Sequence, residues 1–320
     1  MLFEKQFVNA YKSNMLVRHD PGGTARYFGP EDFPEIIVEE FDFTSRMGHT
    51  LKGYFYKKEG TREDRVILFE HGMGCGHRAY MREIATIVDA GYYVFSYDHT
   101  GTLASGGDHI GGLTQSLVDL DDAISALKAA GRLDGKTLSV IGHSWGGFSS
   151  MNIGAIHKDI THIVTMSGYP SVRRMLGKIL KGLLKGYIPA VLRSEEERFG
   201  GYADADAKFN LLNTPAKVLL IHSRDDHMVP FAIFEELEGL LGERENLSFL
   251  PLDGKRHNPT YTADAVVYKD DFFAAVTEMR KKKKFPTPES KAEFVARYDF
   301  VRMTAQDEEV WQKIFGHLES

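Results

Sequence analysis

Short apolar runs alternate with amphipathic segments along most of this chain. Runs of four or five apolar or β-branched residues are typical of strands that are buried on both faces, as in a parallel sheet covered by helices. The six runs of this kind lie at residues 66–69, 92–96, 138–141, 163–166, 218–221 and 247–250. We therefore predict that they form the parallel strands of one sheet.

Two earlier segments, 35–43 and 51–57, show a partial alternation of apolar and polar residues. Alternation indicates strands with one exposed face, and the turn-like residues 46–50 between them favour a hairpin. We predict that the two segments pair in the antiparallel direction at one edge of the sheet. The expected sheet then has eight strands.

Three segments between the runs carry apolar residues at helical spacing, and a glycine follows each of them. They are 81–90 with Gly91, 117–130 with Gly131 and 231–241 with Gly242. Glycine is favoured just after a helix because it adopts the left-handed conformation without a steric penalty. Strands that alternate with helices predict an α/β fold with a mostly parallel, doubly wound sheet.

Two segments interrupt this alternation. About fifty residues separate the runs at 163–166 and 218–221, far more than a loop and one helix need. The tail after residue 284 begins with two prolines and then becomes helical in pattern. We divide the chain into an N-terminal arm (1–34), a core (35–167 and 214–284), a helical insertion (168–213) and a C-terminal helical extension (285–320).

The composition fits one large folded core, with 42% hydrophobic and 26% charged residues among 320. The formal net charge of −6 gives no attraction to nucleic acid. The single cysteine, Cys75, rules out an internal disulfide framework and fits a reducing compartment. No apolar run approaches the ~18 residues of a membrane span, and the polar N-terminus lacks a signal-peptide core. We therefore expect a cytoplasmic protein without an integral membrane segment.

The run at 138–141 leads directly into residues 142–146, Gly-His-Ser-Trp-Gly, and a helical pattern follows. In a G-x-S-x-G motif between strand and helix, the serine occupies a tight turn that only small neighbours permit. On these residues the chain resembles the serine hydrolases of the α/β-hydrolase superfamily, over about residues 35–282. The resemblance implies the α/β-hydrolase fold and a nucleophilic Ser144.

Such a serine needs a base and an acid that orients the base. The resemblance implies that the acid and then the histidine follow the serine in the chain. Residues 222–230 resemble the acid loop of the superfamily, which favours Asp226 as the acid. Asp225 is the alternative acid, and its other possible role is in a turn or a helix cap. His257 lies in the polar loop after the last run, where it can reach back to Ser144.

The resemblance also implies an oxyanion hole formed by two backbone N–H groups. One belongs to Trp145, which follows the nucleophile, and the other to Met73 in the loop His71-Gly72-Met73-Gly74. Neighbouring side chains are candidates for the substrate pocket. They are His71, Cys75 and His143, with Leu176, Leu180 and Leu183 from the insertion.

The superfamily commonly carries a cap at the position of residues 168–213. Apolar residues at i, i+3, i+4 and i+7 predict one amphipathic helix there. They are Val172, Met175, Leu176, Ile179, Leu180, Leu183, Leu184 and Tyr187. Three interpretations stay open: a helix packed on the core, a mobile cap whose apolar stripe lines an acyl pocket, and a basic helix in weak contact with an anionic lipid surface.

The combined pattern predicts a serine hydrolase that cleaves small-molecule carboxylic esters through an acyl-enzyme on Ser144. Neither a metal nor an organic cofactor is expected, because the chain has no metal-binding motif. One alternative is an aminopeptidase of the prolyl-aminopeptidase type, with Glu195, Glu196 or Glu197 anchoring the substrate amine. Another, of a different class, is a non-catalytic ligand-binding protein on the same fold.

Overall fold

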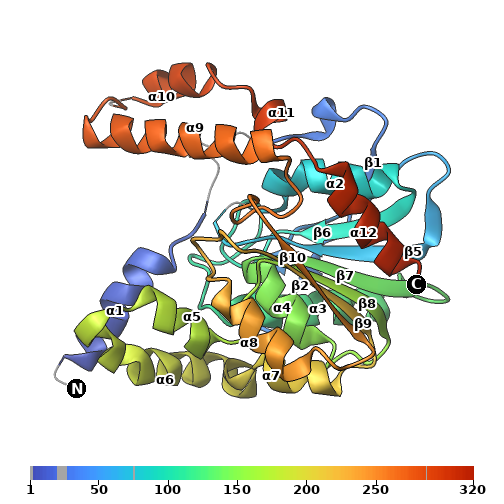
Figure 1. Cartoon of the computed structure of the whole chain (residues 1–320), viewed down its shortest axis with the longest axis horizontal. Helices are drawn as coiled ribbons and strands as arrows, with labels where there is room; N and C mark the ends of the chain where they lie inside the picture. Colours follow the sequence, from blue (N-terminus) through green and yellow to red (C-terminus); the bar gives the residue numbers. More distant parts are fainter. Residues whose placement is uncertain (1–2, 20–26, 75, 286) are drawn as a thin grey trace.

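The computed structural model describes residues 3–19, 27–74, 76–285 and 287–320. A central sheet of eight strands, ordered β1-β4-β6-β5-β7-β8-β9-β10, carries helices on both faces (Figure 1). The edge strands β1 (Ile37–Glu40) and β4 (Gly53–Lys57) pair in the antiparallel direction, and β4 pairs likewise with β6. All other pairs in this sheet are parallel. The predicted mostly parallel, eight-stranded sheet is confirmed.

Each of the six apolar runs lies within a parallel strand. These strands are β5 (Arg62–Glu70), β6 (Tyr92–Tyr97), β7 (Thr137–His143), β8 (Ile160–Met166), β9 (Lys217–Ser223) and β10 (Leu247–Leu252). A separate small hairpin forms from β2 (Phe43–Thr44) and β3 (Thr50–Leu51). The end of the predicted segment 35–43 therefore leaves the main sheet and pairs elsewhere.

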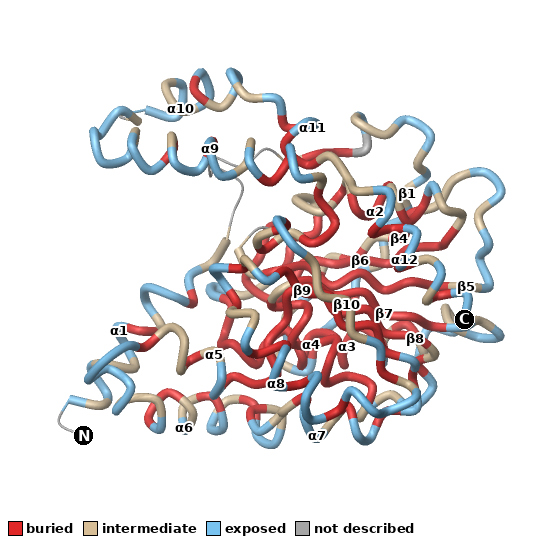
Figure 2. Tube along the Cα trace, in the orientation of Figure 1, coloured by how far each residue is buried: buried red, intermediate tan, exposed pale blue. Residues whose placement is uncertain are grey.

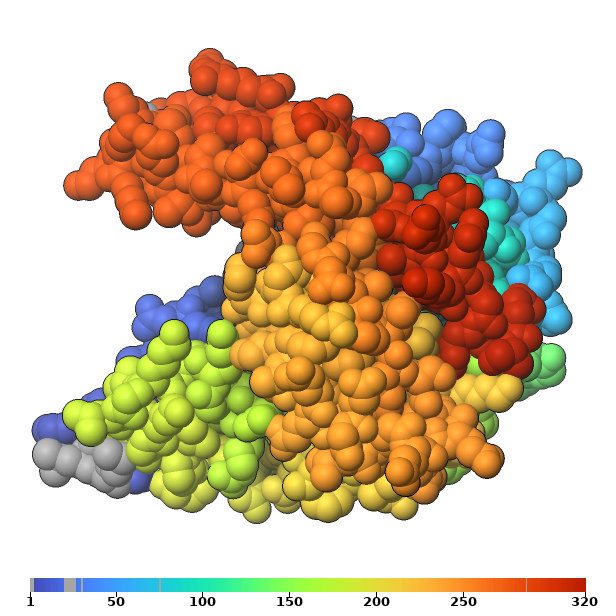
Figure 3. Space-filling model, in the orientation of Figure 1, coloured from blue at the N-terminus to red at the C-terminus, as the bar shows by residue number. Residues whose placement is uncertain are grey.

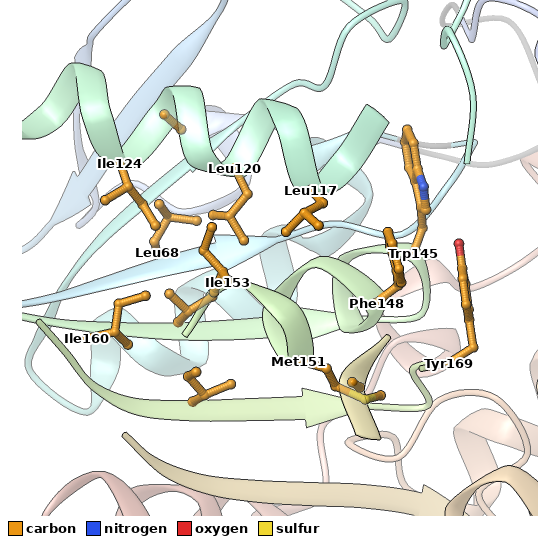
Figure 4. Close-up of a cluster of buried hydrophobic side chains, with 14 of the residues drawn as sticks. Leu68, Leu117, Leu120, Ile124, Trp145, Phe148, Met151, Ile153, Ile160 and Tyr169 are labelled. Atoms are coloured by element: carbon orange, nitrogen blue, oxygen red, sulfur yellow. The ribbon is translucent and has the colours of Figure 1, made fainter. Parts of the chain in front are cut away.

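Alternate residues of the strands face two different layers of the core, because side chains in a strand alternate between the faces of the sheet. Leu68 and Val140 belong to one buried cluster, with α3 (Gln115–Ala129), α4 (Trp145–Ile153) and α8 (Ala232–Leu241). Ile67 and Ile141 belong to the other, with α2 (Met81–Asp89) and α12 (Glu308–Leu318). The buried strands fill the centre of the molecule in Figure 2, and Figure 4 shows the first cluster between α3 and the sheet.

Two of the three predicted helix-ending glycines adopt the left-handed conformation. Gly91 has φ 89° and Gly131 has φ 66°. Gly242 instead keeps a helical φ of −62°, so that part of the prediction was wrong. The polypeptide continues in a right-handed turn there, which any residue tolerates.

The predicted insertion contains several short helices rather than one long one. The expected amphipathic helix over 172–187 breaks into α5 (Val172–Ile179) and the 3-10 helix η3 (Gly182–Tyr187). Gly182 has φ 56°, a left-handed conformation that interrupts an α-helix. The insertion continues through α6 (Ile188–Phe199), η4 (Gly200–Asp204), α7 (Ala207–Asn210) and η5 (Leu211–Asn213).

The N-terminal arm packs on this insertion. Helix α1 (Glu4–Met15) contacts α6, and the Phe7 ring stacks on the Tyr187 ring at a centroid distance of 4.1 Å. A second helical lobe comprises α9 (Ala263–Lys281), α10 (Pro288–Val295) and α11 (Phe300–Met303). The space-filling view shows a deep hollow between this lobe and the α1–α5 side of the molecule (Figure 3).

The last helix, α12, belongs to the core and not to a separate extension. Trp311, Ile314 and Leu318 are buried in the same cluster as Val164 of β8. The Arg65 guanidinium at the start of β5 donates to the Leu318 carbonyl at 2.6 Å. The end of the predicted extension, 285–320, therefore completes one helical layer on the sheet. Among the described residues, no helix is both long and apolar enough to cross a membrane.

Candidate active site

Ser144 occupies a strained turn between β7 and α4. Its backbone has φ 57° and ψ −109°, a conformation that is costly for a residue with a side chain. A Cβ on Gly142 would lie 2.1 Å from the Gly146 carbonyl oxygen, and one on Gly146 would lie 2.3 Å from the Glu70 carbonyl oxygen. Both glycines of the motif are therefore required by direct backbone contact, and the turn holds the serine in a fixed position.

A chain of hydrogen bonds joins Ser144 to two distant residues. His257 Nε2 lies 2.8 Å from Ser144 Oγ, and His257 Nδ1 lies 2.8 Å from Asp226 Oδ2. Asp226 follows β9 and His257 follows β10, so the parallel sheet brings all three side chains to the carboxyl ends of its strands. The structure thus places together the three residues that the sequence indicated.

The environment of Asp226 keeps its carboxylate ionised. Its Oδ1 accepts the backbone N–H groups of Met228 at 2.7 Å and of Val229 at 2.9 Å. Burial alone raises the pKa of Asp226, but hydrogen bonds from His222 and His257 outweigh it and hold that pKa well below its usual range. An ionised carboxylate at this position keeps the Nδ1 proton of His257 in place and leaves Nε2 free to accept a proton from Ser144.

Asp225, the alternative acid, has a different set of partners. Its Oδ1 accepts from the Ser223 hydroxyl at 2.5 Å and from the Arg256 backbone N–H at 3.1 Å. Arg256 has φ 50°, so Asp225 holds a left-handed turn immediately before His257. The two neighbouring aspartates therefore differ in function within the fold, since only Asp226 hydrogen-bonds the imidazole.

Two loops place backbone amides near the serine. Trp145 is the first residue of α4, where N–H groups have no partner within the helix and carry a partial positive charge. Its indole N–H donates to the Leu113 carbonyl at 2.7 Å, which fixes the start of the helix. Across the site, a Cβ on Gly72 would lie 3.4 Å from Ser144 Cβ and 2.5 Å from the Tyr80 hydroxyl. The loop that carries Met73 therefore approaches the serine closely because it has glycine there.

A buried charge cluster supports that loop from below. His99 Nε2 lies 3.2 Å from Glu70 Oε2, and His99 Nδ1 lies 3.3 Å from Asp119 Oδ2. All three side chains are fully buried. Burial alone lowers the pKa of His99, but the two carboxylates outweigh it and raise the pKa to about 9. The two carboxylates therefore favour the protonated form of His99, next to Glu70 at the end of β5.

We expect the free energy of unfolding to fall as the pH rises from about 6.5 to 10. A folded-state pKa raised to about 9 contributes stability below the unfolded-state value of about 6.5, and this contribution is lost as the pH passes 9, on the order of 3 kcal/mol in total. Urea unfolding at several pH values, together with ¹⁵N NMR of the His99 imidazole, measures both effects. Loss of the His99 proton below pH 7 would contradict the prediction.

His143 connects the nucleophile turn to the histidine loop. Its Nε2–H donates to the His257 carbonyl at 2.6 Å, and its Nδ1 accepts from the Tyr80 hydroxyl at 2.8 Å. Burial, reinforced by His257, lowers the pKa of His143 to about 3. The ring is therefore neutral at neutral pH, and its single N–H proton positions the backbone of His257.

A cavity of about 340 Å³ opens beside Ser144. It is lined by Gly72, Met73, Tyr80, His143, Ser144, His227, Met228, Arg256, His257, Asn258, Lys269, Asp270 and Phe273. The last three come from α9, which sequence analysis assigned only to the core. The sequence shows two adjacent phenylalanines there, but only the structure shows that Phe272 is buried whereas Phe273 is 45% exposed.

Several predicted pocket residues lie elsewhere. His71 is buried below the loop, with its ring 4.4 Å from that of His99, and Cys75 lies outside the described residues. Leu176 and Leu180 are buried, whereas Leu183 is 92% exposed. None of the three leucines lines the Ser144 cavity as described. Leu176 of α5 packs into the core, whereas Leu183 lies in η3, after the break at Gly182. His143 does line the cavity.

The glutamates at the end of the insertion also lie away from Ser144. The buried Glu195 accepts the backbone N–H groups of Leu113 and Thr114 at 3.0 and 2.9 Å, just before α3. Glu196 lines a separate cavity and Glu197 is exposed. Within the described ranges, no group of three or more His, Cys, Asp and Glu side chains is arranged to hold a metal ion.

Comparisons with known proteins agree with this architecture. A family model described as serine aminopeptidase, S33, matches residues 61–198. The uncharacterised protein YfhR of Escherichia coli K12 is 23% identical over 251 residues, covering 77% of this chain and 81% of YfhR. The esterase Pf2001 of Pyrococcus furiosus superposes with a TM-score of 0.60 at 19% identity, covering 82% of this chain and 98% of that one.

A Pyrococcus horikoshii acylaminoacyl peptidase superposes with a TM-score of 0.51 at 17% identity, covering 72% of this chain and 40% of the peptidase. The sheet, its flanking helices and these similarities show the α/β-hydrolase fold. The matching family model is that of the S33 serine aminopeptidases, and the structural neighbours include both esterases and peptidases.

Proposed function

We propose that this protein is a serine hydrolase that cleaves carboxylic esters through an acyl-enzyme on Ser144. The observation that carries the proposal is the hydrogen-bonded chain from Ser144 through His257 to Asp226, with both distances 2.8 Å. An isolated hydroxyl is a poor nucleophile, whereas a serine within reach of an oriented imidazole can lose its proton as it attacks.

In the proposed mechanism, His257 Nε2 accepts the Ser144 proton while Oγ attacks the ester carbonyl carbon. The amides of Met73 and Trp145 stabilise the oxyanion, and Asp226 stabilises the imidazolium. The imidazolium then protonates the departing alkoxide, and the alcohol leaves. Water, deprotonated by His257, attacks the acyl-enzyme and releases the carboxylic acid, which restores Ser144.

The walls of the cavity support an ester with an apolar acyl group. Met73, Tyr80, Met228 and Phe273 supply apolar surface beside Ser144. An aminopeptidase needs a carboxylate that anchors the substrate amine, and Glu195 is already engaged by the α3 start. In the lining of the Ser144 cavity, Asp270 supplies the carboxylate that could anchor a substrate amine. Its Oδ2 lies 3.3 Å from Arg256 Nε. The aminopeptidase is the second candidate, because the family model carries that description.

A panel of p-nitrophenyl esters with acyl chains of 2 to 16 carbons, run beside aminoacyl-naphthylamides, tests the proposal. A cavity of about 340 Å³ accommodates about ten non-hydrogen atoms at about 30 Å³ each. We therefore expect the highest kcat/KM for short and medium chains and at least tenfold less for the longest. Hydrolysis of the naphthylamides alone would contradict the ester proposal, and hydrolysis of neither would favour a non-catalytic protein.

Replacement of Tyr80 by phenylalanine should lower kcat about tenfold, with KM changed less than twofold. The variant removes the hydrogen bond to His143 Nδ1, worth about 1–1.5 kcal/mol, and so loosens the anchor of the His257 carbonyl. Steady-state kinetics on the best ester measures the split, and Tyr298→Phe, in the α9–α11 lobe, is the control. An increase in KM at constant kcat would show that Tyr80 contacts the substrate and does not position His257.

A further inference from the structure

A cavity of about 770 Å³ lies away from Ser144. It is formed by α5, the end of η3, the start of α6, the α7 segment and one face of α8. It shares no lining residue with the Ser144 cavity. We call it the α5–α8 cavity.

Cationic side chains from three separate elements surround this cavity. They are Arg173, Arg174 and Lys178 of α5, Lys185 of η3 and Lys208 of α7. Two carboxylates also line it, and both are engaged: Glu236 pairs with Arg174, and Asp206 accepts the Lys208 backbone N–H at 3.1 Å. Within the described ranges, the other four cations form no ion pair. Five cations against two carboxylates give the lining a net charge of +3, on a chain whose net charge is −6.

The floor of the α5–α8 cavity is apolar. Ile233 and Leu237 of α8 are buried, Ile188 of α6 is half-buried, and Leu240 is 60% exposed. Cationic side chains that only face solvent do not require an apolar surface beside them. An inorganic anion would leave the floor exposed to water, and a neutral lipid would leave the cations without a partner. A ligand with an alkyl chain and an anionic head satisfies both parts.

We propose that the α5–α8 cavity binds an amphipathic anion, namely a single alkyl chain that ends in a carboxylate or phosphate. The chain lies on Ile233, Leu237 and Leu240, and the head lies among Arg173, Lys178 and Lys185. About 770 Å³ holds some 25 non-hydrogen atoms at about 30 Å³ each, which is more than a twelve-carbon chain with its head requires. The proposal does not depend on the catalytic function of Ser144.

Isothermal titration of the full-length protein with dodecanoate, below its micelle concentration, tests the proposal. Dodecyl phosphate, dodecanol, butanoate and inorganic phosphate are titrated beside it. We expect one site per chain for dodecanoate or dodecyl phosphate, whichever head is preferred, and at least tenfold weaker binding of the other three ligands. Equal binding of inorganic phosphate would overturn the proposal, because it would show a site for charge alone.

Four variants test whether the ligand binds in the α5–α8 cavity or elsewhere on the protein. R173Q/K178Q should weaken binding at least tenfold, and L240Q should weaken it several-fold; the replaced side chains are at the surface, and thermal unfolding checks that both variants fold. K281Q/K282Q removes two charges at the end of α9, and F273A alters the Ser144 cavity; both should bind like the wild type. Loss of binding in F273A would place the ligand beside Ser144 and overturn the proposal. Equal losses of binding in R173Q/K178Q and K281Q/K282Q would also overturn it.

Vesicles of anionic phospholipid provide the final comparison. If the protein sediments with these vesicles through the same residues while monomeric dodecanoate and dodecyl phosphate do not bind, then the basic surface contacts a membrane. That result would overturn the proposal of an internal ligand.

Discussion

Replacing Ser144 with alanine is expected to lower kcat/KM for the best ester by about 10⁶-fold. The variant keeps the strained turn, the glycines and the hydrogen bond between His257 and Asp226, but it removes the atom that becomes acylated. A residual rate above that of water would reflect the oxyanion amides and substrate binding alone. Steady-state kinetics with active-site titration measures the loss.

A fluorophosphonate probe gives the same test without a known substrate. It should label the wild type at Ser144 and leave Ser144→Ala unlabelled, and peptide mass spectrometry identifies the modified residue. Ser248→Ala, which alters an exposed serine on β10, should be labelled like the wild type. Equal labelling of Ser144→Ala would show that another nucleophile reacts, and the proposed mechanism would be wrong.

Exchange of Asp226 for asparagine is expected to lower kcat by about 10⁴-fold, as loss of the orienting carboxylate does in serine hydrolases. The asparagine is nearly isosteric but carries no charge, so it no longer stabilises the imidazolium or holds the proton on Nδ1. Asp225→Asn is the matched control, because it changes the adjacent residue in the same way. It weakens the hydrogen bonds to Ser223 and the Arg256 amide, and we expect no more than about a tenfold loss.

A direct comparison of the two variants on the same ester distinguishes the two aspartates, because Asp226 Oδ2 is the carboxylate oxygen that lies 2.8 Å from His257 Nδ1. If Asp225→Asn costs more activity than Asp226→Asn, then Asp225 is the acid and the observed geometry is not the catalytic one.

The hydrophobic pattern predicted the sheet well because a strand that is covered on both faces is predominantly apolar. Ile67 and Leu68 face opposite layers of the core, and both are almost completely buried. Local geometry also explains why the nucleophile turn could be predicted from the sequence. A missing Cβ at Gly142 and Gly146 is visible in the sequence, and the backbone contacts at those positions permit no other residue.

The candidate pocket was harder to predict because its walls come from separate parts of the chain. Helical periodicity shows which side of a helix is apolar, but it does not show what that side meets. The stripe containing Leu176 packs into the core, whereas Phe273 of α9 faces the Ser144 cavity. Trp311 and Ile314 of the predicted extension close a layer that begins more than two hundred residues earlier, and helical periodicity does not show which layer they join.

The sequence by itself determined the strands and the nucleophile turn, since each depends on interactions within a few residues or on a regular pattern of burial. The resemblance to the superfamily implied the order serine, acid, histidine, with Asp226 favoured and Asp225 left as an alternative. Only the tertiary structure decided that Asp226 and not Asp225 meets His257, that α9 forms a wall of the cavity, and that five cations gather over an apolar floor. Those features depend on the direction of side chains from distant elements. Direction is set by packing of the whole chain, which no local pattern records.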